Sequence, residues 1–129
     1  PNLPEAAALL EASPARDEDE MRVQAQKLLA LGVGSVLLKG GHGSGPESVD
    51  LLVDAHSCQR LAAPRLATKN THGSGCTLAS AIAAGLAKGL SLENAVKNAK
   101  AYVSAAIAAA DRLAVGSGRG PLHHFYDWW

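Results

Sequence analysis

Charged and aromatic residues are scarce in this sequence, and neither sign of charge is in excess. Charged side chains make up 19% and aromatic ones 4% of the 129 residues, and 12 basic residues balance 12 acidic ones. Proteins that bind the nucleic-acid backbone usually carry a basic stripe, which is missing, so we expect no nucleic-acid partner. Hydrophobic residues reach 47%, which excludes a disordered chain and is enough for a buried core.

Long apolar runs and cysteines are also lacking. No apolar run approaches the roughly 20 residues that cross a bilayer, so we expect no membrane association. The two cysteines, Cys58 and Cys76, lie in different sequence settings, and Cys76 has the setting of a reactive thiol rather than a structural one. A reducing, cytoplasmic location is therefore expected.

The hydrophobic pattern alternates between helical and strand-like periods, which is typical of the α/β class. A helix, a glycine and a buried strand follow one another at 17–39, as in half of a parallel βαβ unit, and 49–66 has the pattern of a hairpin. No repeat or linker divides the chain, so we expect a single domain. The predicted helices are 6–11, 17–31, 76–88 and 92–113, the predicted strands are 33–39, 49–55 and 58–66, and the predicted loops are 40–48 and 116–120.

A glycine-rich turn, Gly73-Ser74-Gly75-Cys76, stands immediately before an Ala-rich helical run. Glycine reaches dihedrals that let consecutive N–H groups point into one concavity, and the helix adds its unpaired first-turn N–H groups and the positive end of its dipole. Such a turn is suited to a phosphate or another anion. The same field favours the thiolate of Cys76, so the sequence indicates an active centre here.

Three other interpretations of this region remain open. The turn could be a tight strand-to-helix connection whose glycines serve only geometry. His72 and Cys76 could form the dyad of a hydrolase, although nothing in the sequence marks a third, orienting residue. The same pair could bind zinc with His56 and Cys58, but these spacings match no standard ligand pair.

Four ordered segments resemble hydroxymethylpyrimidine/phosphomethylpyrimidine kinases, the thiamine-pathway members of the ribokinase superfamily. Residues 70–78 (NTHGSGCTL) resemble the signature of that family, with serine at position 74 where threonine is commoner. Residues 1–5 (PNLPE) resemble its Asn-x-x-Glu segment, 36–42 (VLLKGGH) its strand ending in Lys-Gly-Gly-His, and 87–103 its C-terminal helix pair. The resemblance covers essentially the whole chain but only about the second half of a family member.

The resemblance implies roles for residues of the glycine-rich turn. Gly73, Ser74, Gly75 and Cys76 would form the anion hole for the phosphoryl group in flight. Cys76 would accept the proton of the substrate hydroxyl, a role that aspartate has in many sugar-kinase relatives. Proton transfer would accompany phosphoryl transfer, because an alcohol is a far weaker acid than a thiol.

The resemblance also implies a nucleotide site for ATP and Mg²⁺. Asn2, Lys39 and Thr71 would bind the nucleotide, and Glu5 would reach the metal ion through water. His42 is a further candidate. By themselves, Asn2 and Glu5 could equally be a helix cap and a solvent-facing acid. Lys100 has the setting of a surface helix residue and is left out of the site.

The fold that the resemblance implies is a ribokinase-like three-layer α/β sandwich, with a mainly parallel sheet flanked by helices. Residues 1–129 would be the C-terminal part of such a kinase domain, and the part that recognises the pyrimidine substrate would be absent, since the chain opens at Pro1 within a motif. The complete protein is expected to be a homodimer. The alternatives are a non-catalytic nucleotide-binding remnant and a relative of pyridoxal kinase.

Overall fold

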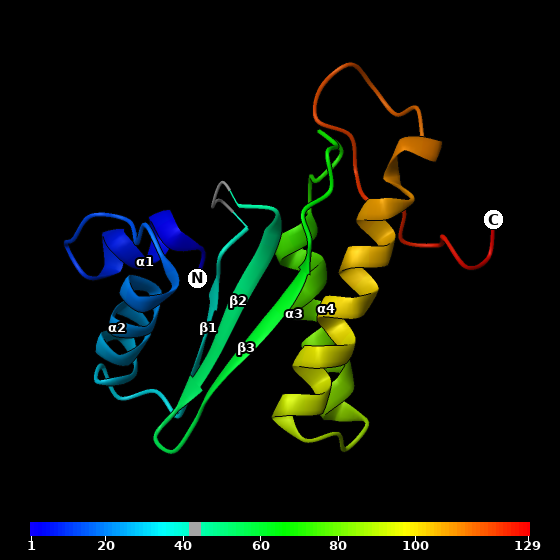
Figure 1. The fold of residues 1–129 in the computed structure, drawn as a ribbon. Helices are drawn as coiled ribbons and strands as arrows, with labels where there is room; N and C mark the ends of the chain where they lie inside the picture. Colours follow the sequence, from blue (N-terminus) through cyan, green and yellow to red (C-terminus); the bar gives the residue numbers. More distant parts are fainter. Residues whose placement is uncertain (42–44) are drawn as a thin grey trace. The chain divides into compact units, whose positions relative to one another are not determined.

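The computed structural model describes residues 1–41 and 45–129, which form two compact units. The first unit runs from Pro1 to Arg65 and the second from Leu66 to Trp129. The first contains helices α1 and α2 and a sheet, and the second contains the long helices α3 and α4 (Figure 1). No helix in the described part of the chain is long and apolar enough to cross a bilayer.

The order of helices and strands is the one that the sequence predicts, and the boundaries differ by a few residues. The first helix begins at residue 3 rather than 6, and the last ends at 108 and is followed by a short 3-10 helix, η1. The elements are α1 (Leu3–Leu9), α2 (Glu18–Leu29), β1 (Ser35–Lys39), β2 (Glu47–Asp54), β3 (Cys58–Pro64), α3 (Ser74–Ala87), α4 (Leu92–Ala108) and η1 (Ala110–Arg112).

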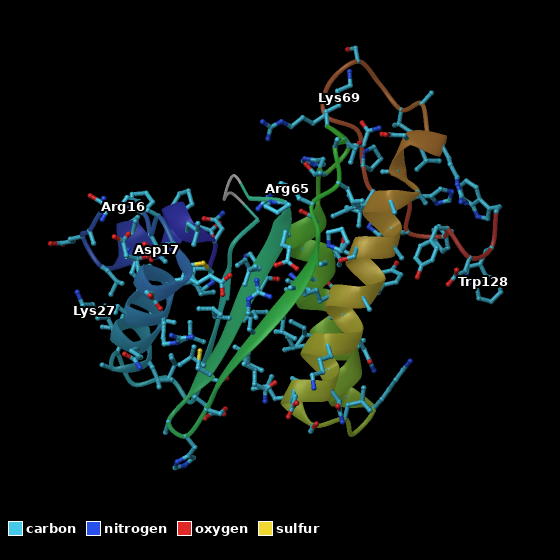
Figure 2. The ribbon with its side chains drawn as sticks, in the orientation of Figure 1. Arg16, Asp17, Lys27, Arg65, Lys69 and Trp128 are labelled. Atoms are coloured by element: carbon cyan, nitrogen blue, oxygen red, sulfur yellow. The ribbon has the colours of Figure 1, made fainter. Side chains whose placement is uncertain are left out.

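Side chains cap the first two helices. At the start of α1, Asn2 Oδ1 accepts a hydrogen bond from the Glu5 N–H at 2.8 Å, and Glu5 Oε2 accepts one from the Asn2 N–H at 2.7 Å. This capping box explains why α1 begins earlier than predicted. At the start of α2, where Figure 2 labels Asp17, the Asp17 carboxylate accepts the N–H of Glu20 at 2.8 Å.

The sheet has the order β1-β2-β3, and both strand pairs are antiparallel. The expectation of a mainly parallel sheet is wrong for these three strands, whereas the hairpin predicted at 49–66 is confirmed. The reason lies in the connections, because a parallel crossover needs about a dozen residues or more and those at 40–46 and 55–57 are shorter. A parallel bridge does join Asn2 to Lys39 at the end of β1.

Arg65, at the end of the first unit, holds the backbone on both sides of residues 42–44. Its guanidinium donates hydrogen bonds to the carbonyls of Gly41 at 2.7 Å, Gly45 at 2.6 Å and Glu47 at 2.8 Å (Figure 2). An arginine fork suits this task because its rigid donors can reach several acceptors at once. His42, a candidate from the sequence, lies outside the described residues.

The core of the first unit forms where α1 and α2 pack against β1 and β2. Side chains that point to one face alternate along a strand, and every second residue of β1 and β2 enters this core. The buried residues from the strands are Val36, Leu38, Val49, Leu51 and Val53, and those from the helices include Leu3, Ala6, Met21, Ala25 and Leu28.

The second unit is a pair of packed helices with a returning tail. Gly89, with a φ of +83°, lies in the connection between α3 and α4, and Gly85 lies so close to α4 that a Cβ there would approach Ala95 Cβ to 3.0 Å. Figure 1 shows the chain after η1 passing back along α4. There the N–H of His123 donates to the Ala106 carbonyl at 2.9 Å, and the Tyr102 hydroxyl donates to the His124 carbonyl at 2.9 Å.

Leu51→Ala is expected to lower the free energy of unfolding of the chain by about 2–5 kcal/mol, because Leu51 is fully buried in the first core. Leu9→Ala removes the same atoms from a side chain that is 63% exposed and serves as the control. Urea unfolding followed by circular dichroism measures both. Similar losses for the two variants would contradict the core described above.

Candidate functional site

Gly73 turns the chain into α3 within a single residue. Its φ of 85° and ψ of 0° lie in the left-handed region, and α3 begins at the next residue. Glycine adopts this conformation without the steric cost that a Cβ brings. The helix start predicted at Cys76 therefore lies two residues earlier, at Ser74.

The first turn of α3 presents N–H groups without an acceptor. The Thr77 N–H begins the helical ladder by donating to the Gly73 carbonyl at 2.9 Å, and the Ser74 N–H donates to the Thr71 carbonyl at 3.2 Å. The N–H groups of Gly75 and Cys76 have no acceptor among the described residues, and no side chain caps the helix. Exposed N–H groups at the positive end of a helix dipole can bind an anion.

Cys76 and Thr77 follow in this first turn. Cys76 is exposed and forms no disulfide, so its sulfur is accessible at the mouth of the turn. Thr77 Oγ1 donates to the Gly73 carbonyl at 2.9 Å and lies 3.0 Å from His124 Nε2. Because the hydroxyl proton is used toward Gly73, the imidazole is the donor in the contact with His124. Thr77 and His124 thus brace the turn, a role that the sequence did not indicate.

The segment before the turn is held by the chain near Gly120. The His72 N–H donates to the Gly120 carbonyl at 3.1 Å, and His72 forms an isolated parallel bridge with Pro121. Asn70 contacts the same loop, because its Oδ1 accepts the Gly120 N–H at 3.1 Å. Thr71, a predicted nucleotide-binding residue, lies between these two attachments. Sequence reasoning missed them because they join residues about fifty positions apart.

Three other predicted site residues meet in the first unit. Asn2 and Glu5 form the capping box of α1, and Lys39 ends β1 beside it. Lys39 Nζ lies 3.9 Å from Glu5 Oε2, and the Lys39 N–H donates to the Pro1 carbonyl at 2.8 Å. Asn2 and Glu5 therefore act as a helix cap, one of the two interpretations open from the sequence, and the ammonium group lies close to this cap.

The Glu5 carboxylate is suited to a water-mediated contact with Mg²⁺. Its side chain is 56% exposed, so water can reach it, although one oxygen accepts the Asn2 N–H and lies near Lys39. Mg²⁺ usually keeps several waters and takes only one or two protein carboxylates together with substrate phosphates. Within residues 1–41 and 45–129, no group of three His, Cys, Asp or Glu side chains could hold a metal ion.

The predicted site residues thus fall into two groups. Asn2, Glu5 and Lys39 come together in the first unit, and Thr71 lies next to the 73–76 turn in the second. Lys100, which the sequence indicated as a surface residue, is buried, with 9% of its surface exposed. The surface prediction for Lys100 was wrong because the face that α4 buries is wider than its apolar residues indicate.

The hydrolase interpretation receives no support from the hydrogen bonds in the described part of the chain. None of these bonds joins His72 to Cys76. A nucleophile and its base are expected within hydrogen-bond reach of each other. The anion-binding interpretation is the one that the geometry of the turn favours.

The fold places the chain among kinases. The structure of the pyridoxal kinase from Staphylococcus aureus in complex with AMP-PCP and pyridoxal is similar, with a TM-score of 0.92 and 32% identity over 99% of this chain and 47% of that one. The fold class is the ribokinase-like α/β class, as the sequence predicted. The sequence profile described as phosphomethylpyrimidine kinase matches residues 1–123, and the chain belongs to this family.

Named relatives agree with this assignment. The hydroxymethylpyrimidine/phosphomethylpyrimidine kinase of Escherichia coli is 53% identical over 129 residues, covering 100% of this chain and 48% of the relative. The thiamine biosynthesis bifunctional protein of Geobacter sulfurreducens is 49% identical over 124 residues, covering 96% of this chain and 25% of that protein. The chain therefore spans about half the length of the E. coli kinase and a smaller share of the bifunctional protein.

Gly73→Ala is expected to destabilise the chain by about 1–2 kcal/mol, because alanine at a φ of 85° brings its Cβ close to the following carbonyl oxygen. Gly118→Ala is the matched control, since Gly118 has no positive φ and a Cβ added there would meet no atom within 4 Å. Urea unfolding measures both variants. An equal effect at the two positions would contradict a strained turn at Gly73.

Proposed function

We propose that this chain provides the phosphate-binding and phosphoryl-transfer part of a kinase that uses ATP to phosphorylate hydroxymethylpyrimidine and then its monophosphate. The family and the names of the E. coli and G. sulfurreducens relatives support this substrate class and a role in thiamine biosynthesis. The observation that carries the proposal is the uncapped start of α3, with the N–H groups of Gly75 and Cys76 exposed after the left-handed Gly73.

The chemistry of phosphoryl transfer suits such a turn. The transferred group spreads negative charge over its oxygens and needs mainly positioning and charge stabilisation. N–H groups that are already fixed in the folded protein stabilise developing charge without reorganising during the reaction. Gly73, Ser74, Gly75 and Cys76 would together form this anion hole, with the N–H groups of Gly75 and Cys76 as its donors.

Cys76 would accept the proton of the substrate hydroxyl. Its sulfur is exposed in the first turn of α3. An alcohol is too weak an acid to lose its proton beforehand, so the thiolate would take it while the phosphoryl group moves. The monophosphate is a different acceptor, because its oxygen is largely deprotonated at neutral pH and needs little help from a base.

Asn2, Lys39 and Thr71 would bind the nucleotide. Lys39 would place its ammonium group against the ATP phosphates, Asn2 and Thr71 would contact the nucleotide, and Glu5 would hold Mg²⁺ through water. When bound, the ion would neutralise part of the phosphate charge. The crystallised AMP-PCP complex of the S. aureus pyridoxal kinase supports the use of ATP.

The complete protein would contain more than these residues. Because the chain covers 48% of the E. coli relative, we propose that residues 1–129 correspond to the C-terminal part of the kinase domain and that most pyrimidine contacts lie elsewhere in the full length. A cytoplasmic homodimer is proposed for the complete protein. Pyridoxal kinase activity is the less favoured substrate alternative, since the pyridoxal kinase structure is 32% identical and the E. coli pyrimidine kinase 53%.

Cys76→Ala in the complete protein is expected to lower kcat for hydroxymethylpyrimidine by about 10²–10⁴-fold, the usual contribution of a general base. Phosphorylation of the monophosphate is expected to fall much less, because that acceptor needs no proton removal. Nucleotide affinity is expected to stay nearly unchanged. Steady-state kinetics with both acceptors and calorimetric titration with AMP-PCP measure these quantities.

Cys58→Ala is the control for this experiment, since Cys58 is also an exposed thiol but lies at the start of β3. It is expected to leave both reactions unchanged. Equal turnover of hydroxymethylpyrimidine by the Cys76→Ala variant and the unmodified protein would remove Cys76 from the catalytic role.

The 129-residue chain by itself is expected to bind nucleotide weakly and to phosphorylate the pyrimidine poorly, because the proposed substrate contacts lie elsewhere in the complete protein. Activity assays of a purified chain of verified mass, beside the complete protein, test this. Robust turnover by the isolated chain would overturn the proposal that most of the pyrimidine contacts lie outside residues 1–129.

The same assays separate the kinase from a non-catalytic nucleotide-binding remnant. A remnant would bind AMP-PCP yet leave both pyrimidine acceptors unphosphorylated even in the complete protein. Parallel assays with pyridoxal distinguish the third alternative.

A further inference from the structure

A polar cluster in the second unit fixes the segment that leads into the 73–76 turn. Its members are Thr68, Asn70, Asp111 and Gly120. The Asn70 Nδ2 donates to Asp111 Oδ1 at 2.8 Å, and the Thr68 hydroxyl donates to the same oxygen at 2.5 Å. The Thr68 oxygen in turn accepts the Asn70 N–H at 3.1 Å. One carboxylate from η1 therefore holds two side chains of the approaching segment.

Asn70 connects this carboxylate to the C-terminal loop. While its amide nitrogen donates to Asp111, its Oδ1 accepts the N–H of Gly120 at 3.1 Å. The Gly120 carbonyl accepts the N–H of His72, so the backbone of Gly120 is bonded to both residues that flank Thr71. Asn70 is suited to this position because a carboxamide has its donor and its acceptor on two separate atoms, whereas a carboxylate has acceptors only and a hydroxyl has both functions on one oxygen.

The space at Gly120 agrees with this arrangement. A Cβ on residue 120 would clash with Asn70 Oδ1 and come to 2.9 Å from Asn70 Cγ. The carboxamide is therefore seated directly against the Gly120 backbone, which is buried. Any side chain at position 120 would push the carboxamide of Asn70 away.

We propose that Asn70 is a positioning residue for phosphoryl transfer, holding the 73–76 turn in register through Asp111 and Gly120. This inference rests on the proposed function, since the turn it positions is the proposed anion hole. Only Thr71 and His72 separate Asn70 from Gly73, and the His72 N–H shares the same anchor. A displacement of the Asn70 backbone would therefore also displace the N–H groups of Gly75 and Cys76, because few residues lie between them. Misplacement of a catalytic group by about 1 Å can cost 10²-fold in rate.

An exchange of side chains tests the proposal in the complete protein. Asn70→Asp removes the donor and sets two carboxylates against each other, so kcat for hydroxymethylpyrimidine is expected to fall by about 10- to 100-fold. Asp111→Asn keeps an acceptor for Asn70 and for Thr68, so kcat is expected to stay within a few-fold of the unmodified protein. The double variant Asn70→Asp/Asp111→Asn restores the hydrogen bond with donor and acceptor reversed, and most of kcat is expected to return.

Further measurements separate positioning from folding. The KM for the pyrimidine is expected to change little in Asn70→Asp, because both polar atoms of the Asn70 carboxamide are bonded to Asp111 and Gly120, and a thermal unfolding curve shows whether the variant is folded. Asn94→Asp introduces the same chemical change at an exposed position of α4 and is expected to leave kcat unchanged. Gly120→Ala is expected to lower kcat as Asn70→Asp does, whereas Gly118→Ala, with no atom within 4 Å, is not.

The possible outcomes are distinct. Loss of kcat in Asn70→Asp with recovery in the double variant supports the positioning role. Full activity of Asn70→Asp, or a double variant that stays as slow as Asn70→Asp, overturns it. An unmodified complete protein that phosphorylates no pyrimidine would instead overturn the proposed function itself.

Discussion

The second unit depends on one backbone constraint, the left-handed conformation at Gly73. Because a single residue turns the chain, α3 begins without a residue whose side chain could cap it, and the N–H groups of Gly75 and Cys76 are left without an acceptor among the described residues. Other helices of the chain solve the same problem with a cap, as Asn2, Asp17 and Ser91 do. The surroundings of Gly73 hold the turn from outside instead, through the Thr77 hydroxyl on its carbonyl and the Gly120 backbone on the preceding residues. An uncapped helix start that is firmly held is what an anion site requires.

The first unit shows the opposite arrangement, in which a cap and a proposed ligand site are made by the same side chains. Asn2 and Glu5 satisfy each other's backbone N–H groups, and this local exchange explains their sequence spacing without any ligand. The capping box also fixes the carboxylate of Glu5 close to the ammonium of Lys39. The backbone of Lys39 is held beside the cap because its N–H donates to the Pro1 carbonyl. A structural role and a role in nucleotide binding are compatible here, because the Glu5 side chain remains partly exposed.

Much of the fold was predictable because its signals are local. The acidic first turn of α2, the hairpin between β2 and β3 and the glycine-rich start of α3 all follow from residues close in sequence. The predicted parallel sheet was wrong for β1 to β3 because strand direction depends on which strands pair, and a helix followed by a strand does not reveal the partner. Lys100 was predicted to be a surface residue because helical periodicity marks the apolar face of α4 but not how far the buried surface extends beyond it.

The sequence by itself determined the family and the position of the glycine-rich turn before α3, since each depends on residue types at short, fixed spacings. The tertiary structure decided what holds that turn. Asn70, Asp111 and Gly120 lie on three separate segments, and their contacts arise only when the chain after α4 returns to the segment before α3. Thr77 and His124 meet across a similar separation. A hydrogen bond of this kind forms only where the folded backbone brings donor and acceptor within about 3 Å of each other. The local sequence around either residue does not predict that distance.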